Sequence, residues 1–239
     1  MVLKVENLSV TYAHKTAVDR ISFQVKTGQV IGLLGANGAG KSSTIAAVLG
    51  IETSTYDELV IVGKSPIRNR KEIFEQVGVQ FQETRFQDKL TVSDACKQWQ
   101  ALYKKTADVP ALLQTFGLAN KEKQLVKLLS GGERQRLAVL LALIHEPKLV
   151  FLDELTSGLD TKARRMLWKQ LITMKEDGLA IVLTSHYMDE VEALCDEILI
   201  LREGQTVFHG TIQEALKLSG KIKLEDAYLH FAGEEEHWE

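Results

Sequence analysis

Short runs of apolar residues alternate along the chain with longer stretches in which polar residues recur at helical spacing. Residues 2–12 and 17–25 mix β-branched and apolar residues with polar ones, and the polar linker 13–16 between them is typical of a hairpin. The run 29–34 is short and apolar, and residues 41–49 after it have helical spacing. The pattern therefore predicts an antiparallel β element, followed by the strand, loop and helix that begin a parallel sheet.

The next apolar runs have the length and composition of further buried strands. Between the second and the third of them lies a long polar stretch, 83–130, whose pattern is helical where it is regular, and we interpret residues 83–145 as a helical insertion. Within this stretch Thr91 is expected to cap one helix, and Pro110 suits the first turn of the next. The expected buried strands are 58–62, 77–81, 148–152, 179–184 and 196–202.

The last forty residues have a weaker pattern. Gly204 predicts a hairpin turn, and residues 211–218 and 224–231 are typical of short helices. No internal repeat and no Gly/Ser-rich linker marks a second domain. We therefore expect one α/β domain over residues 1–239, with a core at 1–82 and 146–210, a helical subdomain at 83–145 and a C-terminal extension at 211–239.

The composition is that of an ordinary folded protein. Of 239 residues, 45% are hydrophobic and 26% are charged, which excludes wholesale disorder. The net charge of −3 supplies no broad positive field, so we expect no nucleic-acid partner. Cys96 and Cys195 have no metal-ligand spacing, which favours a reducing cytosol. The first residues lack a signal-peptide pattern, and the longest apolar run, 137–144, is too short to cross a bilayer.

A phosphate-binding loop is predicted between the strand 29–34 and the helix 41–49. The pattern GxxxxGK[ST] lets consecutive backbone N–H groups surround a phosphate, and Lys41 adds a point charge between the β- and γ-phosphates. Ser42 is then placed to ligate Mg²⁺. An ordinary glycine-rich turn is the alternative, but the strand and helix around the loop favour a nucleotide site. Its residues are Gly35, Ala36, Asn37, Gly38, Ala39, Gly40, Lys41, Ser42 and Ser43.

Two carboxylates follow the apolar run 149–152. A strand buried on both faces of a parallel sheet is continuously apolar, and ligands of open α/β sheets gather at the carboxyl ends of the strands. Asp153 is therefore expected to hold Mg²⁺ through a water, and Glu154 to polarise the water that attacks the γ-phosphate. A loop that merely begins with two acids is the alternative, which the phosphate loop disfavours.

A further motif is Leu129-Ser-Gly-Gly-Glu133-Arg-Gln-Arg-Leu, at the start of a predicted helix. Ser130 and Glu133 form a capping-box pattern, which needs no ligand. Gly131 and Gly132 are costly in a first turn, yet they expose N–H groups at the positive end of the helix. The two glycines therefore indicate a second anion site.

Together these motifs resemble those of the ATP-binding-cassette (ABC) ATPases. The resemblance covers residues 1–210 and implies an α/β fold: a P-loop NTPase (RecA-like) core with an N-terminal antiparallel β element and a helical insertion subdomain. It implies that Gln82 ligates Mg²⁺ and senses the γ-phosphate, that His186 is a catalytic switch and that Tyr12 stacks on adenine. It also implies that Asp160, in Ser157-Gly-Leu-Asp160, belongs to a loop of the dimer interface.

The resemblance implies ATP and Mg²⁺ as cofactors and a second cassette as partner, most simply a second copy. It implies separate membrane subunits docked on residues 83–90, which include Phe86 and Leu90, and a cytoplasmic location at the inner face of the cell membrane. Segments 77–92 and 224–233 resemble the bacterial drug and antibiotic exporters, so export is the expected direction. Each ATP would lie between the phosphate loop of one chain and Ser130, Gly131, Gly132 and Glu133 of the other.

Two positions depart from the family pattern, which often has proline at Ala36 and usually has it at Leu155. Because proline would rigidify the turn that carries Glu154, Leu155 is expected to loosen that glutamate and slow turnover without preventing binding. The alternative function is a soluble cassette ATPase outside transport, such as a cluster-assembly ATPase. A P-loop kinase would need neither the Ser130 motif nor His186.

Overall fold

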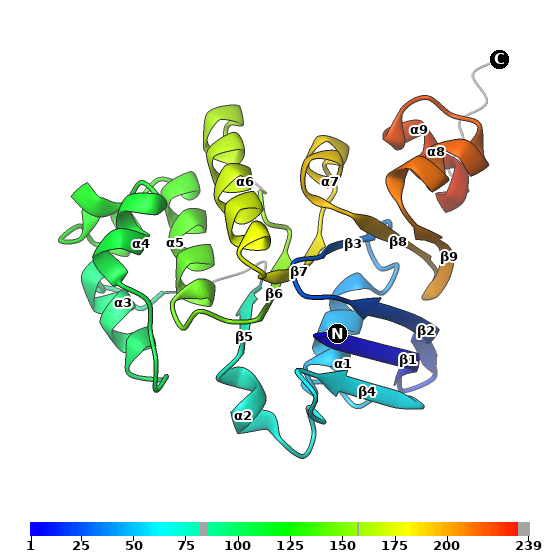
Figure 1. The fold of residues 1–239 in the computed structure, drawn as a ribbon, viewed down its shortest axis with the longest axis horizontal. Helices are drawn as coiled ribbons and strands as arrows, with labels where there is room; N and C mark the ends of the chain where they lie inside the picture. The colour runs from blue at the N-terminus through cyan, green and yellow to red at the C-terminus, as the bar shows by residue number, and fades with distance from the viewer. Residues whose placement is uncertain (82–85, 157, 234–239) are drawn as a thin grey trace.

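The chain folds around two β-sheets that face each other across buried apolar side chains (Figure 1). The computed structural model describes residues 1–81, 86–156 and 158–233. Within these ranges one sheet is antiparallel, in the order β2-β1-β4, and the other has the order β5-β6-β7-β3-β8-β9, parallel except for β9. The strands are β1 (Leu3–Tyr12), β2 (Lys15–Val25), β3 (Val30–Leu34), β4 (Glu58–Ile61), β5 (Val77–Gln80), β6 (Leu149–Asp153), β7 (Ala180–Thr184), β8 (Glu197–Arg202) and β9 (Gln205–Gly210).

Helices pack on both faces of the larger sheet. Helix α1 shares a face with the antiparallel sheet, while α5, α6 and α7 lie on the other face (Figure 1). Helices α3 and α4 lie beside α5, and α8 and α9 pack on β9. The helices are α1 (Lys41–Val48), α2 (Arg70–Phe74), α3 (Val92–Gln100), α4 (Val109–Thr115), α5 (Gly131–Leu143), α6 (Thr161–Glu176), α7 (Met188–Leu194), α8 (Ile212–Ser219) and α9 (Leu224–Ala232).

Successive side chains of β6 and β7, in the larger sheet, alternate between two apolar clusters, which explains the unbroken apolar runs of these strands. Along β6, Leu149 and Phe151 join the cluster shared with α1 and the antiparallel sheet, whereas Val150 and Leu152 join the cluster with α5 and α6. Strand β7 alternates in the same way. Each strand therefore meets apolar neighbours on both faces, as expected of parallel strands between two covering layers.

The predicted hairpin at the start of the chain and the predicted turn at Gly204 are confirmed. For residues 58–62 the predicted strand is present, as β4, but the expectation that it is a fully buried strand is wrong, because β4 pairs antiparallel with β1 and only Leu59 and Ile61 of this run are buried. The pattern also does not single out α2, α6 or α7. For α6 a signal exists, since its buried residues are spaced by four: Ala163, Leu167 and Leu171.

Helices are the regular elements within the described part of 83–145, with turns and loops between them, and both expected helix starts are confirmed. Thr91 forms a capping box with Asp94, and Pro110 lies in the first turn of α4. The expectation that Leu90 is part of a docking surface is wrong, because its side chain is buried in the apolar cluster of α3 and α5. The division of the chain into core, helical subdomain and extension stays a prediction.

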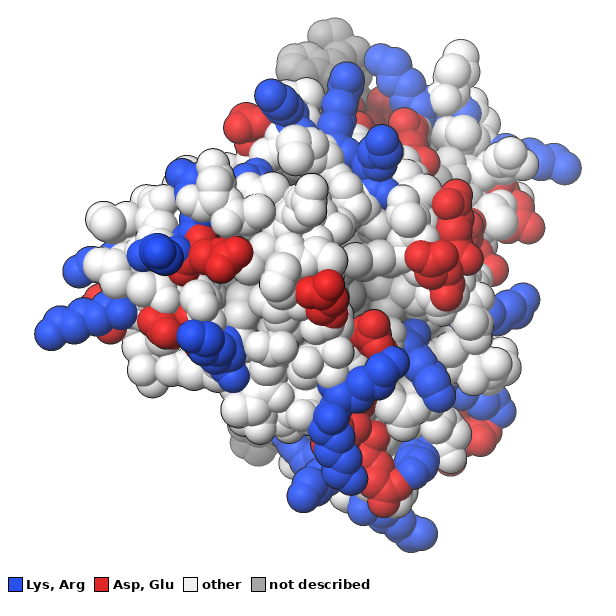
Figure 2. Space-filling model, turned by 60° about the vertical axis from the view of Figure 1, so that its left-hand side comes forward, with Lys and Arg blue, Asp and Glu red and all other residues white. Residues whose placement is uncertain are grey.

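The surface carries charges of both signs. On the face seen in Figure 2, basic and acidic side chains are interspersed around an uncharged area. No helix within residues 1–81, 86–156 and 158–233 has both the length and the hydropathy needed to cross a membrane.

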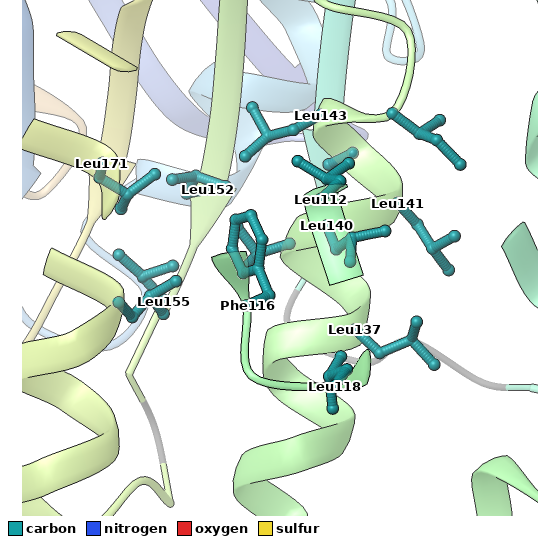
Figure 3. Close-up of a cluster of buried hydrophobic side chains, with 14 of the residues drawn as sticks. Leu112, Phe116, Leu118, Leu137, Leu140, Leu141, Leu143, Leu152, Leu155 and Leu171 are labelled. Carbon is teal, nitrogen blue, oxygen red and sulfur yellow. The ribbon is translucent and has the colours of Figure 1, made fainter. Parts of the chain in front are cut away.

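Phe116, directly after α4, joins the helical stretch to the larger sheet. Its ring is fully buried in a cluster that includes side chains from α4, α5, β6 and α6 (Figure 3). Close to the ring in this view lie Leu112, Leu140, Leu152 and Leu155. Helix α4 is short, so its position depends on this packing more than on its own hydrogen bonds.

Replacing Phe116 by alanine is expected to lower the free energy of unfolding by about 3–5 kcal/mol, because it leaves a cavity in the cluster. Urea unfolding followed by circular dichroism measures this change. Leu128→Ala is the matched control: that side chain is 64% exposed, and its loss should change stability by less than about 0.5 kcal/mol. Equal stability of the two variants would contradict the role of Phe116.

Candidate active site

The loop between β3 and α1 has a backbone that requires glycine at three positions. Gly35, Gly38 and Gly40 have φ of 151°, 82° and 106°. At two of them the backbone of other segments is also too close for a side chain. A Cβ on Gly35 would lie 2.5 Å from the carbonyl oxygen of Leu201, and a Cβ on Gly40 would lie 2.6 Å from the carbonyl oxygen of Ala17. Larger residues are therefore excluded, and the backbone N–H groups of the loop stay uncovered by side chains.

Lys41 begins α1 and is almost completely buried. Its ammonium donates hydrogen bonds to the carbonyl oxygens of Gly35 at 2.6 Å and of Ala36 at 3.0 Å. Burial lowers the pKa of Lys41, while the nearby carboxylates of Glu154 and Asp153 act in the opposite direction. A buried cation at the N-terminus of a helix is suited to attract phosphate.

Asp153 ends β6 and is held from two sides. Ser42 donates a hydrogen bond to one carboxylate oxygen at 3.3 Å, and Thr184, at the end of β7, donates to the other at 2.5 Å. The Thr184 hydroxyl also accepts a hydrogen bond from the backbone N–H of Glu154 at 2.9 Å. Thr184 thus orients both acids. The sequence signal for it, a hydroxyl at the end of a buried strand, becomes visible only once β6 and β7 are known to be neighbours.

Glu154 and His186 meet across the ends of β6 and β7. Glu154 Oε1 lies 3.2 Å from His186 Nε2, and Glu154 has a φ of 51°, in the left-handed region that non-glycine residues rarely adopt. Both side chains border a pocket of about 520 Å³ that also includes the phosphate loop. The pocket is lined by Asn37, Gly38, Gly40, Lys41, Ser42, Ser43, Glu154 and His186.

Tyr12 lies at the edge of this site, and its hydroxyl donates a long hydrogen bond of 3.5 Å to Ser43 Oγ. Its ring is 43% exposed, so one part of it is accessible to a flat ligand. Gln82 lies outside the described residues. Gln80, which the sequence pattern does not single out, donates through Nε2 to the carbonyl oxygen of Asp153 at 3.3 Å and so adjoins the acidic end of β6.

The second glycine motif does not line the pocket. Ser130 and Glu133 form the predicted capping box at the start of α5, with hydrogen bonds of 3.2 and 2.9 Å. The hydrogen bond from the backbone of Ser130 lowers the pKa of Glu133 and keeps it ionised. A Cβ on Gly131 would meet nothing within 4 Å, whereas one on Gly132 would lie 3.2 Å from the side chain of Leu159. The first turn of α5 is therefore open at Gly131.

Asp160 also lies apart from the pocket, at the N-terminus of α6. Its carboxylate accepts a hydrogen bond of 2.8 Å from the backbone N–H of Ala163, which is an ordinary helix cap. The capping of α6 is therefore one reason for an aspartate at this position that needs no partner chain. Its expected place in a dimer interface stays a prediction.

Comparison with known proteins decides the family. The profile of the family described as "ABC transporter" matches residues 18–157, which is more than half of the chain. The chain belongs to the ABC transporter family. This ABC ATPase therefore binds and hydrolyses ATP to energise transport, and the predicted family and fold class are confirmed. The alternative, a cassette ATPase outside transport, finds no support in the relatives.

The relatives of this ABC ATPase include bacterial and animal proteins. Nod factor export ATP-binding protein I of Ralstonia nicotianae is 35% identical over 90% of this chain and 68% of its own length. Linearmycin resistance ATP-binding protein LnrL of Bacillus subtilis is 34% identical over 87% of this chain and 69% of its own length. Human retinal-specific phospholipid-transporting ATPase ABCA4 is 35% identical, but the match spans only 10% of that protein.

The fold has a close counterpart among solved structures. A structure described as "Structure of ATP binding subunit of ABC transporter" superposes with a TM-score of 0.89 at 25% sequence identity. The match covers 97% of this chain and 99% of that one. The fold of this ABC ATPase is thus that of an ATP-binding subunit over almost its whole length.

Replacing Lys41 by alanine is expected to abolish ATP binding, because it removes the buried cation that the phosphate loop surrounds. Fluorescence titration with a labelled ATP analogue measures the affinity. Lys217→Ala on α8, an exposed lysine, is the control and should bind like the parent. Tight binding by Lys41→Ala would refute the assignment of the loop.

Leu155→Pro is expected to raise the hydrolysis rate with ATP affinity nearly unchanged, because a proline there restricts the turn that carries Glu154. The Leu155 side chain is fully buried beside Phe116 (Figure 3). The free energy of unfolding of Leu155→Pro should therefore also fall, and the loss of packing contributes about 2–5 kcal/mol, as for other truncated leucines. Leu155→Ala loses the same packing without the ring. Identical hydrolysis rates in the two variants would show that the backbone restriction has no effect.

Proposed function

We propose that this chain is the ATPase subunit of an exporter, with Lys41 binding the phosphates, Glu154 acting as general base and His186 positioning the reacting groups. The observation that carries this proposal is the pocket itself, in which the lysine, the glutamate and the histidine come from the segments that follow three separate strands, β3, β6 and β7. Ligands of open α/β sheets bind at the carboxyl ends of strands. Tyr12, with its partly exposed ring beside Ser43, is the proposed platform for adenine.

Glu154 is suited to accept a proton from water. Its backbone N–H is fixed by the Thr184 hydroxyl, and its carboxylate lies within hydrogen-bond distance of His186. A general base has to be held at a defined place near the bond that changes, and these two contacts hold Glu154 from both ends. His186, which is 40% exposed at its side chain, is free to reach the γ-phosphate on the same side of the pocket.

The residues at the end of β6 fit a magnesium ion. Mg²⁺ prefers oxygen ligands and is commonly bound by one or two side chains together with substrate phosphates. The Ser42 hydroxyl and the Asp153 carboxylate are 3.3 Å apart beside the phosphate loop, so they would hold the ion, together with Gln82 as the resemblance implies. When bound, the ion neutralises phosphate charge.

A second cassette, most simply a second copy, is the proposed partner. In one chain the motif from Ser130 to Glu133 does not reach the pocket that contains Lys41. The open first turn of α5 at Gly131 presents backbone N–H groups to an anion from outside the chain. The γ-phosphate held by the other chain is the proposed anion, and Asp160 would lie in the same interface.

Separate membrane subunits are the proposed recipients of the ATP energy. Two relatives, one named for Nod factor export and one for linearmycin resistance, favour export and a place at the inner face of the cell membrane. Of the expected docking residues, Leu90 is buried, so Phe86 remains, half-buried against Trp99 with ring centres 6.5 Å apart. The proposed docking surface therefore includes Phe86 but not Leu90.

Glu154→Gln is expected to slow ATP hydrolysis by roughly 10²–10⁴-fold, because it removes the base and keeps the shape of the side chain. ATP that is bound but not cleaved should then hold two chains together. Steady-state phosphate release and gel filtration with Mg-ATP measure the two effects. A monomer that hydrolyses ATP at the parent rate would contradict both the base and the second cassette.

The control for this variant is Glu192→Gln on α7, which removes the same charge at another position. Glu192 is exposed and does not line the pocket, so this change should leave both hydrolysis and the elution volume as in the parent.

A further inference from the structure

A completely buried glutamate on α7 has no part in the chemistry described above. Glu190 is 0% exposed, and its Oε1 accepts a hydrogen bond of 3.0 Å from the indole N–H of Trp168 on α6. Its other oxygen, Oε2, is buried and has no hydrogen-bond partner among the described residues. Burial raises the pKa of Glu190. A buried carboxyl with one unpaired oxygen is costly, so its presence calls for a physical reason.

Helix α6 grips the segment that follows His186. Arg164 and Trp168 are four residues apart and so lie on one face of α6, toward α7. The Arg164 guanidinium lies 4.2 Å from the ring centre of Tyr187 and donates a hydrogen bond of 3.3 Å to Asp189. Together with the contact of Trp168 with Glu190, α6 thus contacts three of the first four residues after His186, namely Tyr187, Asp189 and Glu190.

The same helix is the continuation of the segment that begins at Glu154. Only residues 155–160 separate that glutamate from α6. The hydroxyls of Ser185, beside His186, and of Thr156, in the other segment, lie close enough to the Glu190 carboxyl to act against the rise in its pKa. The hydrogen bond from Trp168 to Glu190 therefore links α6, which follows the segment of the proposed base, to α7, which follows the proposed switch.

We propose that Glu190 is a positioning residue: its buried carboxyl joins the segment after Glu154 to the segment around His186 and so keeps His186 Nε2 against Glu154 Oε1. The inference rests on the proposed roles of those two residues. Without this junction α6 contacts the segment after His186, among the described residues, only through Arg164, whose partners Tyr187 and Asp189 are both exposed, and the 3.2 Å approach of His186 to Glu154 loses its one buried support from α6.

The unpaired oxygen of Glu190 has a neighbour with which it can bond. Thr156 Oγ1 is also buried and without a hydrogen bond among the described residues. A protonated carboxyl can donate a hydrogen bond to this hydroxyl oxygen through its O–H, and the amide of a glutamine can do so through its N–H. Glutamine at position 190 should therefore preserve the junction, and alanine should remove it.

The experiment compares variants by steady-state hydrolysis and by ATP affinity. Glu190→Ala should lower kcat by roughly 10–100-fold, the usual cost of misplacing a reacting group by about 1 Å, with ATP affinity nearly unchanged. Glu190→Gln should restore most of the parent rate. Trp168→Phe, which keeps a ring and removes the donor, should lower kcat in the same way as Glu190→Ala if the latter folds poorly. Glu192→Ala, an exposed glutamate on the same helix, should behave like the parent.

A double-mutant cycle with His186→Ala separates positioning from a general loss of stability. If Glu190 acts through His186, adding Glu190→Ala to His186→Ala should cause no further fall in kcat. The inference would be overturned if the double variant lost kcat by the product of the two single losses. It would also be overturned if Glu190→Ala lowered kcat and ATP affinity equally.

The cycle also distinguishes this inference from the proposed function. If His186→Ala is slow while Glu190→Ala and Trp168→Phe hydrolyse ATP at the parent rate, the positioning role is refuted and the proposed function is not. A His186→Ala variant at the parent rate refutes the role of His186, and the positioning role with it.

Discussion

The site depends on the parallel pairing of β7 with β3 on one side and with β6 on the other. In this register Thr184 lies opposite Leu33 on β3 and opposite Asp153 on β6. Parallel strands that start level also end level, so the loops after all three strands leave the sheet at one edge. This register brings the phosphate loop, the acid pair and His186 to the same edge, although more than a hundred residues separate the first from the second.

The electrostatics of the site follow from the same edge. One buried ammonium, on Lys41, and two carboxylates, on Asp153 and Glu154, gather where α1 begins. Burial disfavours the charged lysine, and the acids and the backbone carbonyls of the loop offset part of that cost. An anion such as a nucleotide phosphate adds further compensation, so the cost of burying the lysine favours ligand binding. The glycines complete the arrangement, since a side chain at Gly35 or Gly40 would collide with backbone.

The parts of the site that the sequence predicts are those in which each motif carries its own chemistry. The phosphate loop, the acid pair after β6 and the capping box at Ser130 are local patterns, and the structure has the loop between β3 and α1, the acids at the end of β6 and the box at the start of α5. Thr184, Gln80 and Glu190 are different. Each is an unremarkable polar residue in its own segment, and its importance comes from a neighbour that is distant in the sequence. The two wrong expectations have the same origin. Leu90 is apolar enough for a docking surface and the run 58–62 is apolar enough for a buried strand, but whether either is exposed depends on partners that are distant in the sequence.

The sequence by itself determined the strands of the larger sheet, the starts of α1, α3, α4 and α5, and the type of chemistry. These features depend on apolar periodicity and on backbone hydrogen bonding within a few residues. Only the tertiary structure decided that Glu154 meets His186, that the Ser130 motif does not reach the pocket of its own chain, and that Glu190 of α7 bonds to Trp168 of α6. The physical reason is that these contacts arise from strand order and from packing between α6 and α7. A pattern of residues along the chain does not encode either of them locally.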